Sequence, residues 1–154
     1  LRSEDDRLAI IEGIQDGTID AIASDHRARS KDTKAQPFSA ASVGASGIET
    51  LFSITLDLVH KKIIDINKAI SFLTINPAKI LGIDSPTLEE KKVADFIVFD
   101  ENEPHTIKQE NLKTSPTPFD GKKIHGKILA TYINGHVAFM DQIFKNKIIK
   151  WLMI

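Results

Sequence analysis

The sequence predicts an α/β fold, and three observations support this class. Ile19 to Ala23 form a short apolar run between turn residues, which is typical of a buried strand. The segment before this run has the pattern of an amphipathic helix, and another such helix follows a long polar loop. The order helix, strand, loop, helix indicates a parallel α/β unit. A single strand of this kind leaves edges and faces to cover, so it requires neighbouring strands.

The first helix is predicted to begin after Ser3. The Ser3 hydroxyl can cap it, and the acidic run Glu4–Asp6 suits the positive end of the helix dipole. Apolar residues from Leu8 to Ile14 recur at helical spacing, and Gly17 ends the helix.

Three helices are predicted after the loop. The first covers Ile48–His60, and Asp65 opens the second. For the third we expect Asn76 as the cap and Pro77 as the first helical residue, where its missing N–H costs nothing. Gly82 ends this helix.

From Thr87 onward the pattern favours β structure, which predicts a boundary near residues 84–88. Phe96–Phe99 is an apolar strand, and residues 101–120 are polar and contain prolines, as expected for a loop. Lys123–Ile133 alternates irregularly, as a strand with one buried face does, and Gly126 suggests a bulge.

A hairpin is predicted next to this strand. Asn134-Gly135 between two apolar runs is a strong hairpin signal, and Val137–Met140 is the predicted return strand. The segment 143–154 mixes lysine with apolar residues, and its pattern leaves a strand and a docking helix both open.

Composition limits the classes of function. The 154 residues are 42% hydrophobic and 27% charged, which is ordinary for a globular protein. The formal net charge of −1 argues against nucleic acid or an anionic membrane as the main partner. There is no cysteine, which fits the cytoplasm and excludes disulfides and thiolate metal sites. No apolar run approaches a membrane span.

The polar group at the end of the predicted strand is the main candidate site. Asp25 and His26 follow the run Ile19–Ala23 directly, and the carboxyl ends of strands carry ligands and catalytic groups in α/β folds. A carboxylate there can bind a metal or transfer a proton. The alternative is that Asp25 caps a turn and His26 is an ordinary loop residue.

A metal site formed by this chain alone is not favoured. A catalytic zinc takes about three protein ligands, and the chain offers Asp25 with His26 nearby. The other histidines are scattered singly, and each is more typical of a surface or packed residue: His60, His105, His125 and His136.

The loop after Asp25 is basic and contains glycine. Arg29 can bind a substrate carboxylate, although solvated charge is the commoner role of such residues. Gly44 and Gly47 can present backbone N–H groups to an anion, although a turn from the loop into the helix, with a glycine near the N-cap, explains them better. A structureless loop of about 20 residues is uncommon in a domain and points to a binding or active-site loop.

Together, seven segments in order resemble the C-terminal portion of bacterial-type dihydroorotases in the amidohydrolase superfamily, from Leu1 to about Asp141. They are GTIDAIASDH, KAQPF, GASGIET, LTINPAKILGI, ADFIVFD, TPFDG and INGHVAF. The resemblance implies the end of a (β/α)8 TIM-type barrel, namely strand eight and its flanking helices within residues 1–84. Residues 85–154 then supply the C-terminal strands of a small β-sandwich subdomain and a tail.

The resemblance also implies an activity. The expected reaction is the zinc-dependent, reversible cyclisation of N-carbamoyl-L-aspartate to L-dihydroorotate in pyrimidine biosynthesis. Asp25 matches the family's aspartate at the end of strand eight, which is a zinc ligand and the catalytic acid and base. Because the other metal ligands belong to earlier barrel strands, we expect this chain to be a C-terminal fragment that is inactive alone and self-associates through exposed apolar surface.

Two positions depart from the family pattern. The family's His-Ala-Pro-His reads His26-Arg27-Ala28-Arg29 here, so Arg29 stands where a substrate-binding histidine is expected. The family's Pro-Phe-Gly reads Ser42-Val43-Gly44, so Val43 replaces the aromatic residue and Gly44 remains. The resemblance thus assigns Arg29, Val43 and Gly44 to the substrate.

These departures keep two alternatives open. One is a non-catalytic dihydroorotase-like subunit that assembles with aspartate carbamoyltransferase. The other is a hydantoinase-like or allantoinase-like cyclic amidase, since the departures lie in the loop that sets substrate choice. For all of these functions a homo-oligomer is expected, with aspartate carbamoyltransferase as the candidate partner in a larger assembly.

Overall fold

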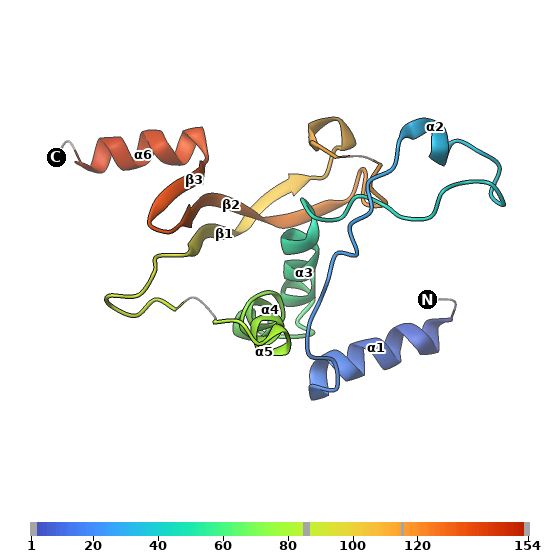
Figure 1. Cartoon of the computed structure of the whole chain (residues 1–154), viewed down its shortest axis with the longest axis horizontal. Coiled ribbons are helices and arrows are strands. Elements are labelled where there is room, and N and C mark those ends of the chain that lie inside the picture. Colours follow the sequence, from blue (N-terminus) through green and yellow to red (C-terminus); the bar gives the residue numbers. More distant parts are fainter. Residues whose placement is uncertain (1–2, 85–86, 115, 153–154) are drawn as a thin grey trace.

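The computed structural model describes residues 3–84, 87–114 and 116–152. Figure 1 shows helix α3 between a three-stranded sheet and the pair α4 and α5, with α1 to one side. The elements, in chain order, are α1 (Glu4–Asp16), α2 (Lys31–Lys34), α3 (Leu51–His60), α4 (Ile66–Leu73), α5 (Ile75–Leu81), β1 (Phe96–Thr106), a 3₁₀ turn (Gln109–Asn111), β2 (Lys123–Ile133), β3 (His136–Met140) and α6 (Gln142–Leu152).

Helix α1 begins and ends as its sequence predicts. Ser3 Oγ accepts the Asp6 N–H at 3.1 Å, and the Asp6 carboxylate accepts the Ser3 N–H at 3.2 Å, which makes a complete capping box. Gly17 ends the helix in the left-handed conformation at φ +90°.

The strand predicted at Ile19–Ala23 is wrong for this structure, because residues 19–30 form no regular secondary structure. A strand requires a neighbouring strand, and the described residues offer none to this segment. Its backbone bonds to helices instead, since Ile22 N–H donates to Phe72 O at 3.2 Å. The apolar pattern does predict burial, because Ile19 and Ile22 pack against the core.

The core lies between helices α1 and α4. Its buried members are Ile14, Ile64, Ala69 and Phe72, and Phe72 is only 2% exposed. Each fully buried side chain of this size contributes about 2 kcal/mol through the hydrophobic effect. This cluster therefore holds α1 against α4. The segment that leads to Asp25 packs on the same cluster through Ile19 and Ile22.

The helices after the loop lie near their predicted positions, but α3 begins at Leu51 instead of Ile48, and α5 begins at Ile75, so Pro77 is its third residue. Asp65 caps α4 by accepting the Lys68 N–H at 2.8 Å, and Gly82 ends α5 at φ +66°. Asn76 does not cap α5, because α4 ends at Leu73 and Thr74 alone separates the two helices. The Asn76 amide instead donates to Asp20 O at 2.8 Å and holds the segment before Asp25.

The sheet is antiparallel with the order β1-β2-β3. Strand β1 continues to Thr106, so the loop predicted from Glu101 was placed too early. The polar residues 101–103 bulge out opposite Gly126, and pairing resumes at Pro104 with His125. The irregularity expected at Gly126 is confirmed, although the extra residues lie on β1.

Gly126 is also the point where α3 packs on β2. Its φ is +100°, and a Cβ there would collide with the buried Leu56 side chain. Ser53 on the same face of α3 donates its hydroxyl to Gly126 O at 3.1 Å. Glycine at 126 therefore lets the helix and the sheet approach closely.

The hairpin and the C-terminal segment complete the fold. Asn134 and Gly135 have φ values of +51° and +75°, as a two-residue hairpin turn requires, and Ile133 pairs with His136. Of the segment 143–154 that the sequence left open, residues 143–152 belong to α6 (Gln142–Leu152), and residues 153 and 154 lie outside the described residues. Of the boundary predicted at residues 84–88, positions 85 and 86 lie outside the described residues, and the division stays a prediction.

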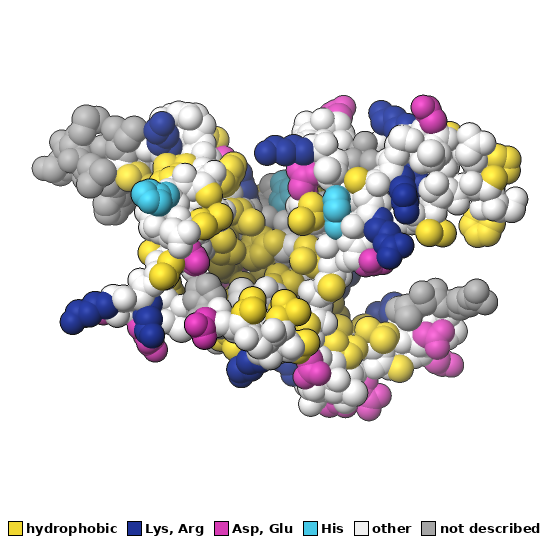
Figure 2. All heavy atoms as spheres, in the orientation of Figure 1, with side chains coloured by type: hydrophobic (Ala, Val, Ile, Leu, Met, Phe, Trp, Pro, Cys, Tyr) yellow, Lys and Arg dark blue, Asp and Glu magenta, His cyan; other side chains and the backbone are white. Residues whose placement is uncertain are grey.

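The molecule exposes much apolar surface. Figure 2 shows hydrophobic side chains gathered in a hollow between the sheet and helices α4 and α5. Leu81 at the end of α5 and Ile83 just after it are 70% and 60% exposed. Patches of this kind are typical of surfaces that contact other protein. In the described part of the chain, no helix has the length and hydrophobicity to span a membrane.

Candidate functional site

Asp25 lies at the end of the segment that crosses the core, in a strained backbone position. Its φ is +42°, which is uncommon for a residue other than glycine and is tolerated best by Asp and Asn. The side chain is 89% exposed, and Oδ1 lies 3.7 Å from Nε of Arg27. The carboxylate is therefore directed outward and is free to meet a ligand.

Residues 24–29 and 43–47 lie side by side and form the base of the site. Arg27 N–H donates to Ala45 O at 2.9 Å. Gly44 has φ +108°, and a Cβ on it would lie 2.7 Å from Arg27 Cβ. A Cβ on Gly47 would lie 3.1 Å from Ser24 O. Both glycines therefore permit a close backbone approach that places Gly44–Gly47 next to Asp25.

His26 joins the site to helix α3, a role that its sequence position does not predict. Its Nδ1 accepts the N–H groups of Gly47 at 3.2 Å and Ile48 at 3.3 Å. A ring nitrogen that accepts carries no proton, so Nδ1 serves as the acceptor of the imidazole ring. His26 thus satisfies two backbone donors at the entry to α3, where an unpaired N–H would be costly.

An open pocket of about 380 Å³ borders Asp25. Its floor is the backbone of Gly44–Gly47, and one wall is formed by Pro118 and Phe119 from the connection between β1 and β2. The pocket thus combines a carboxylate, a glycine-rich backbone and an apolar wall. Small-molecule sites typically combine an apolar lining with a few polar groups in this way.

The other predicted substrate residues are placed differently. Gly44 lines the pocket, whereas Arg29 and Val43 lie beside it in the loop. The Arg29 guanidinium donates to Val43 O at 3.1 Å, and the Val43 side chain is 73% exposed. Lys34 similarly donates to Ser42 O at 3.0 Å and to Gly44 O at 3.1 Å. The basic side chains therefore brace the loop through its carbonyl groups.

The described residues do not by themselves form a catalytic metal site. Nowhere among them do three or more histidine, aspartate or glutamate side chains converge. His60 and His125 make a ring contact at 4.7 Å between centroids, but they belong to α3 and β2 away from Asp25. Asp25 can supply one oxygen ligand, which is fewer than a catalytic zinc requires.

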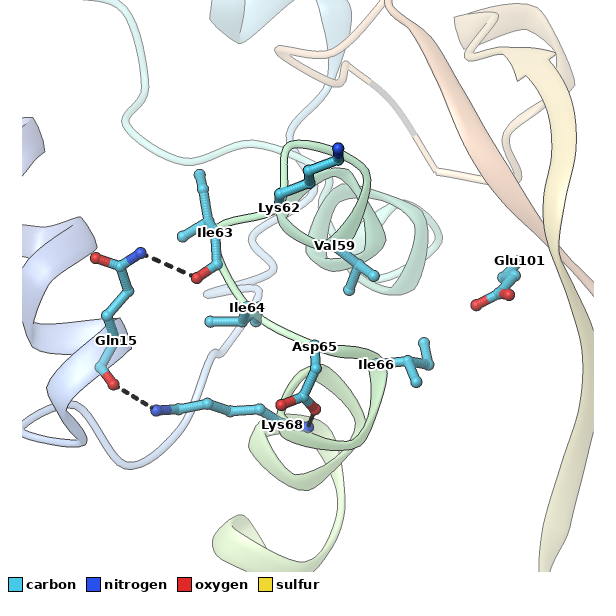
Figure 3. Close-up of a pocket in the computed structure, with 9 residues that line it drawn as sticks. All are labelled: Gln15, Val59, Lys62, Ile63, Ile64, Asp65, Ile66, Lys68 and Glu101. Carbon is cyan, nitrogen blue, oxygen red and sulfur yellow. Dashed lines mark hydrogen bonds between the residues drawn. The ribbon is translucent and has the colours of Figure 1, made fainter.

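A larger cavity of about 700 Å³ lies elsewhere, between α1 and the turn from α3 to α4 (Figure 3). Gln15 donates its side-chain amide to Ile63 O at 3.0 Å and accepts the Lys68 ammonium on its backbone O at 2.7 Å. These contacts tie the end of α1 to α4. Asp25 is absent from the lining, so this cavity is separate from the candidate site.

The comparison of sequences shows the class of protein to which this chain belongs. The amidohydrolase family model matches residues 1–138, and the chain belongs to this family. The dihydroorotase of Clostridium acetobutylicum is 40% identical over 145 residues, which are 92% of this chain and 34% of that protein. The dihydroorotase of Clostridioides difficile is 39% identical over 140 residues, with 90% and 33% covered. The chain therefore spans about a third of the length of these relatives.

Solved structures show the same fold. The L-hydantoinase (dihydropyrimidinase) of Arthrobacter aurescens has a TM-score of 0.82 at 24% identity, covering 90% of this chain and 32% of that one. The inactive dihydroorotase-like domain of the Chaetomium thermophilum CAD-like multifunctional protein has a TM-score of 0.67 at 17% identity, with 92% and 38% covered. At these identities the likeness concerns the fold alone.

Proposed function

We propose that this chain is the C-terminal part of a zinc-dependent dihydroorotase, which interconverts N-carbamoyl-L-aspartate and L-dihydroorotate in pyrimidine biosynthesis. The observation that carries the proposal is the identity of 39–40% with dihydroorotases over at least 90% of this chain. The chain covers 33–34% of those proteins, so the activity belongs to the whole protein and the chain alone is inactive.

In this proposal, residues 1–84 are the closing part of a (β/α)8 barrel, and residues 85–154 contribute strands to a β-sandwich. The segment 19–23 becomes the eighth strand once neighbouring strands pair with it. Its apolar residues support this interpretation, because Ile19 and Ile22 already pack against the core. The exposed apolar side chains of α5 are then covered by the rest of the barrel.

Asp25 is the proposed proton carrier. In ring opening it accepts a proton from the attacking water and delivers it to the ring nitrogen that leaves, and in ring closure it reverses these transfers. Its exposed carboxylate on the border of the pocket supports this role. Its φ of +42° is uncommon for a residue other than glycine, and such backbone outliers gather at functional sites.

Zinc, when bound in the whole protein, would supply Lewis-acid activation of the ring carbonyl. Asp25 would be one ligand, and the others would come from outside this chain, because the described residues lack a set of three. The Gly44 backbone would contact the substrate amide. Arg29 would release Val43 O and bind the substrate carboxylate, a bidentate contact that guanidinium favours.

The proposal includes the setting of the protein. A homo-oligomer in the cytoplasm fits a metabolic enzyme of this family, and aspartate carbamoyltransferase is the proposed partner in any larger assembly. The exposed apolar surface supports association with other protein chains.

A second candidate is a non-catalytic dihydroorotase-like subunit. Arg29 favours it, because an arginine cannot accept a hydrogen bond as histidine does, and here it bonds Val43 O in the loop. A hydantoinase-like or allantoinase-like amidase is the third candidate, supported by the same change in the loop.

One assay separates the three candidates. The purified full-length protein is supplied with zinc and tested on dihydroorotate, hydantoin and allantoin. Turnover of dihydroorotate alone is the expected result. Preference for hydantoin or allantoin would replace the proposal with the third candidate, and no turnover of any of them would favour the second.

A further inference from the structure

The apolar wall of the Asp25 pocket comes from a distant part of the chain. Pro118 and Phe119 lie in the connection between β1 and β2, more than ninety positions after Asp25. Loops of this kind hold their position only where specific contacts fix them. The contacts that fix this wall therefore decide the shape of the pocket.

Glu49, just before α3, makes three hydrogen bonds to the start of the segment that leads to this wall. One carboxylate oxygen accepts the Lys113 N–H at 3.1 Å. The other accepts the Thr114 N–H at 3.0 Å and the Thr114 hydroxyl at 3.0 Å. Hydrogen bonds to an ionised carboxylate are stronger than neutral ones. A single side chain thus holds the start of the wall segment with three donors.

Ser46 extends this connection into the floor of the pocket. It is 2% exposed, and its N–H donates to Pro116 O at 2.8 Å. Its hydroxyl also hydrogen-bonds the Thr114 hydroxyl. Because Ser46 lines the pocket, the wall, the floor and Glu49 are linked through one network.

The charge on Glu49 suits this role. Partial burial raises the pKa of Glu49. The hydrogen bonds from the Lys113 and Thr114 N–H groups and the Thr114 hydroxyl, together with the Lys113 charge, lower the pKa by more than burial raises it. The pKa of Glu49 therefore lies below its ordinary value. Glu49 is therefore ionised at neutral pH and accepts all three hydrogen bonds.

We propose that Glu49 is a positioning residue that fastens the wall formed by Pro118 and Phe119 against the Asp25 pocket and thereby limits the size of ring substituent that enters. The proposal rests on the function proposed above for its substrate. Its structural part, the fastening of the wall, does not depend on which cyclic amide reacts.

A cysteine probe tests the fastening without any assay of activity. The chain has no native cysteine, so Ala45→Cys places a unique thiol in the pocket floor. Its reaction with a small and with a bulky thiol reagent is timed, with and without Glu49→Gln. In Glu49→Gln an amide NH2 group replaces one of the two accepting carboxylate oxygens. This new donor then faces a backbone N–H, so a hydrogen bond is lost. We expect about tenfold faster labelling by the bulky reagent and little change for the small one.

A control and a second measurement make the result decisive. Glu12→Gln on the exposed face of α1 makes the same charge change and should leave both labelling rates unaltered. Hydrogen exchange of the Ser46 amide, whose acceptor is Pro116 O, should also accelerate in Glu49→Gln at native Ala45. The proposal would be overturned if the bulky reagent labels Ala45→Cys at the same rate with and without Glu49→Gln and the exchange rate of the Ser46 amide is also unchanged.

The enzymatic arm uses the full-length protein with zinc. The quantity measured is the ratio of kcat/KM for a cyclic amide with an aromatic ring substituent to kcat/KM for dihydroorotate. Glu49→Gln should raise this ratio by about tenfold, mainly by lowering KM for the aromatic substrate. An unchanged ratio would overturn the selectivity part. If wild-type protein turns over no cyclic amide, the proposed function fails, while the cysteine and exchange measurements still decide the role of Glu49.

Discussion

Nδ1 of His26 accepts the backbone N–H of Gly47 at 3.2 Å, although the two residues are separated by a loop of twenty positions. This contact closes the base of the loop and joins the residue after Asp25 to the start of α3. It makes His26 a structural link of the site, whatever chemistry Asp25 performs.

The first prediction concerns His26. His26→Ala leaves the Gly47 and Ile48 N–H groups without their acceptor and should lower the free energy of unfolding by about 1–2 kcal/mol. His26→Asn retains a side-chain acceptor and should lose less. Urea unfolding followed by circular dichroism measures both, and equal stability of His26→Ala and wild type would contradict the proposed link.

The second prediction concerns the close approach at Gly44. Gly44→Ala combines a φ of +108° with a Cβ 2.7 Å from Arg27 Cβ, and should cost about 2–4 kcal/mol in unfolding free energy. Gly17→Ala is the matched control, because its φ is +90° but nothing lies within 4 Å of the new Cβ. The control should therefore lose only about 1 kcal/mol. If the two variants lose similar amounts of unfolding free energy, the Arg27 side chain moves away from the new Cβ at no cost, and the prediction is contradicted.

The third prediction is a pH dependence from Asp57 in α3. Its carboxylate, 19% exposed, accepts from Lys122 at 2.8 Å and from Lys61 at 2.9 Å. Burial raises the pKa of Asp57, but these hydrogen bonds and the two lysine charges lower it by a larger amount. The pKa of Asp57 therefore lies below its ordinary value. A lowered pKa gives stability that is present above the ordinary carboxyl value and is lost as the pH falls through the folded-state pKa.

Asp57→Asn should therefore reduce stability by about 1 kcal/mol at pH 7, and the difference from wild type should shrink steadily below about pH 4. Urea unfolding at a series of pH values measures this difference. A difference that stays constant into acid would show that the ion pairs add nothing to stability.

Local signals in the sequence predict much of the fold. Ser3, Asp65 and Gly82 set helix ends through contacts within a few residues, and Asn134-Gly135 sets the hairpin by backbone conformation alone. These helix ends and this turn depend only on residues close together in the chain, so they can be predicted from the sequence.

Features that depend on distant partners are harder to predict. Ile19–Ala23 has the composition of a strand, yet strand formation needs a neighbour that the described residues lack. The pairing of residues 104–106 with β2 likewise has no local signal. In the site, Asp25 and Gly44 line one pocket, whereas the roles of His26 and Glu49 arise from contacts across 21 and 65 positions.

The central claim is that the Asp25 carboxylate carries the proton in a dihydroorotase reaction. The most direct measurement is kcat for dihydroorotate hydrolysis by full-length Asp25→Asn and Asp25→Ala, with bound zinc quantified in each variant. Asp32→Asn, an exposed aspartate in the same loop, is the control for loss of charge. We predict a fall of at least about a hundredfold in kcat for both Asp25 variants and near wild-type turnover for Asp32→Asn. Turnover retained in Asp25→Asn at full zinc content would contradict the account.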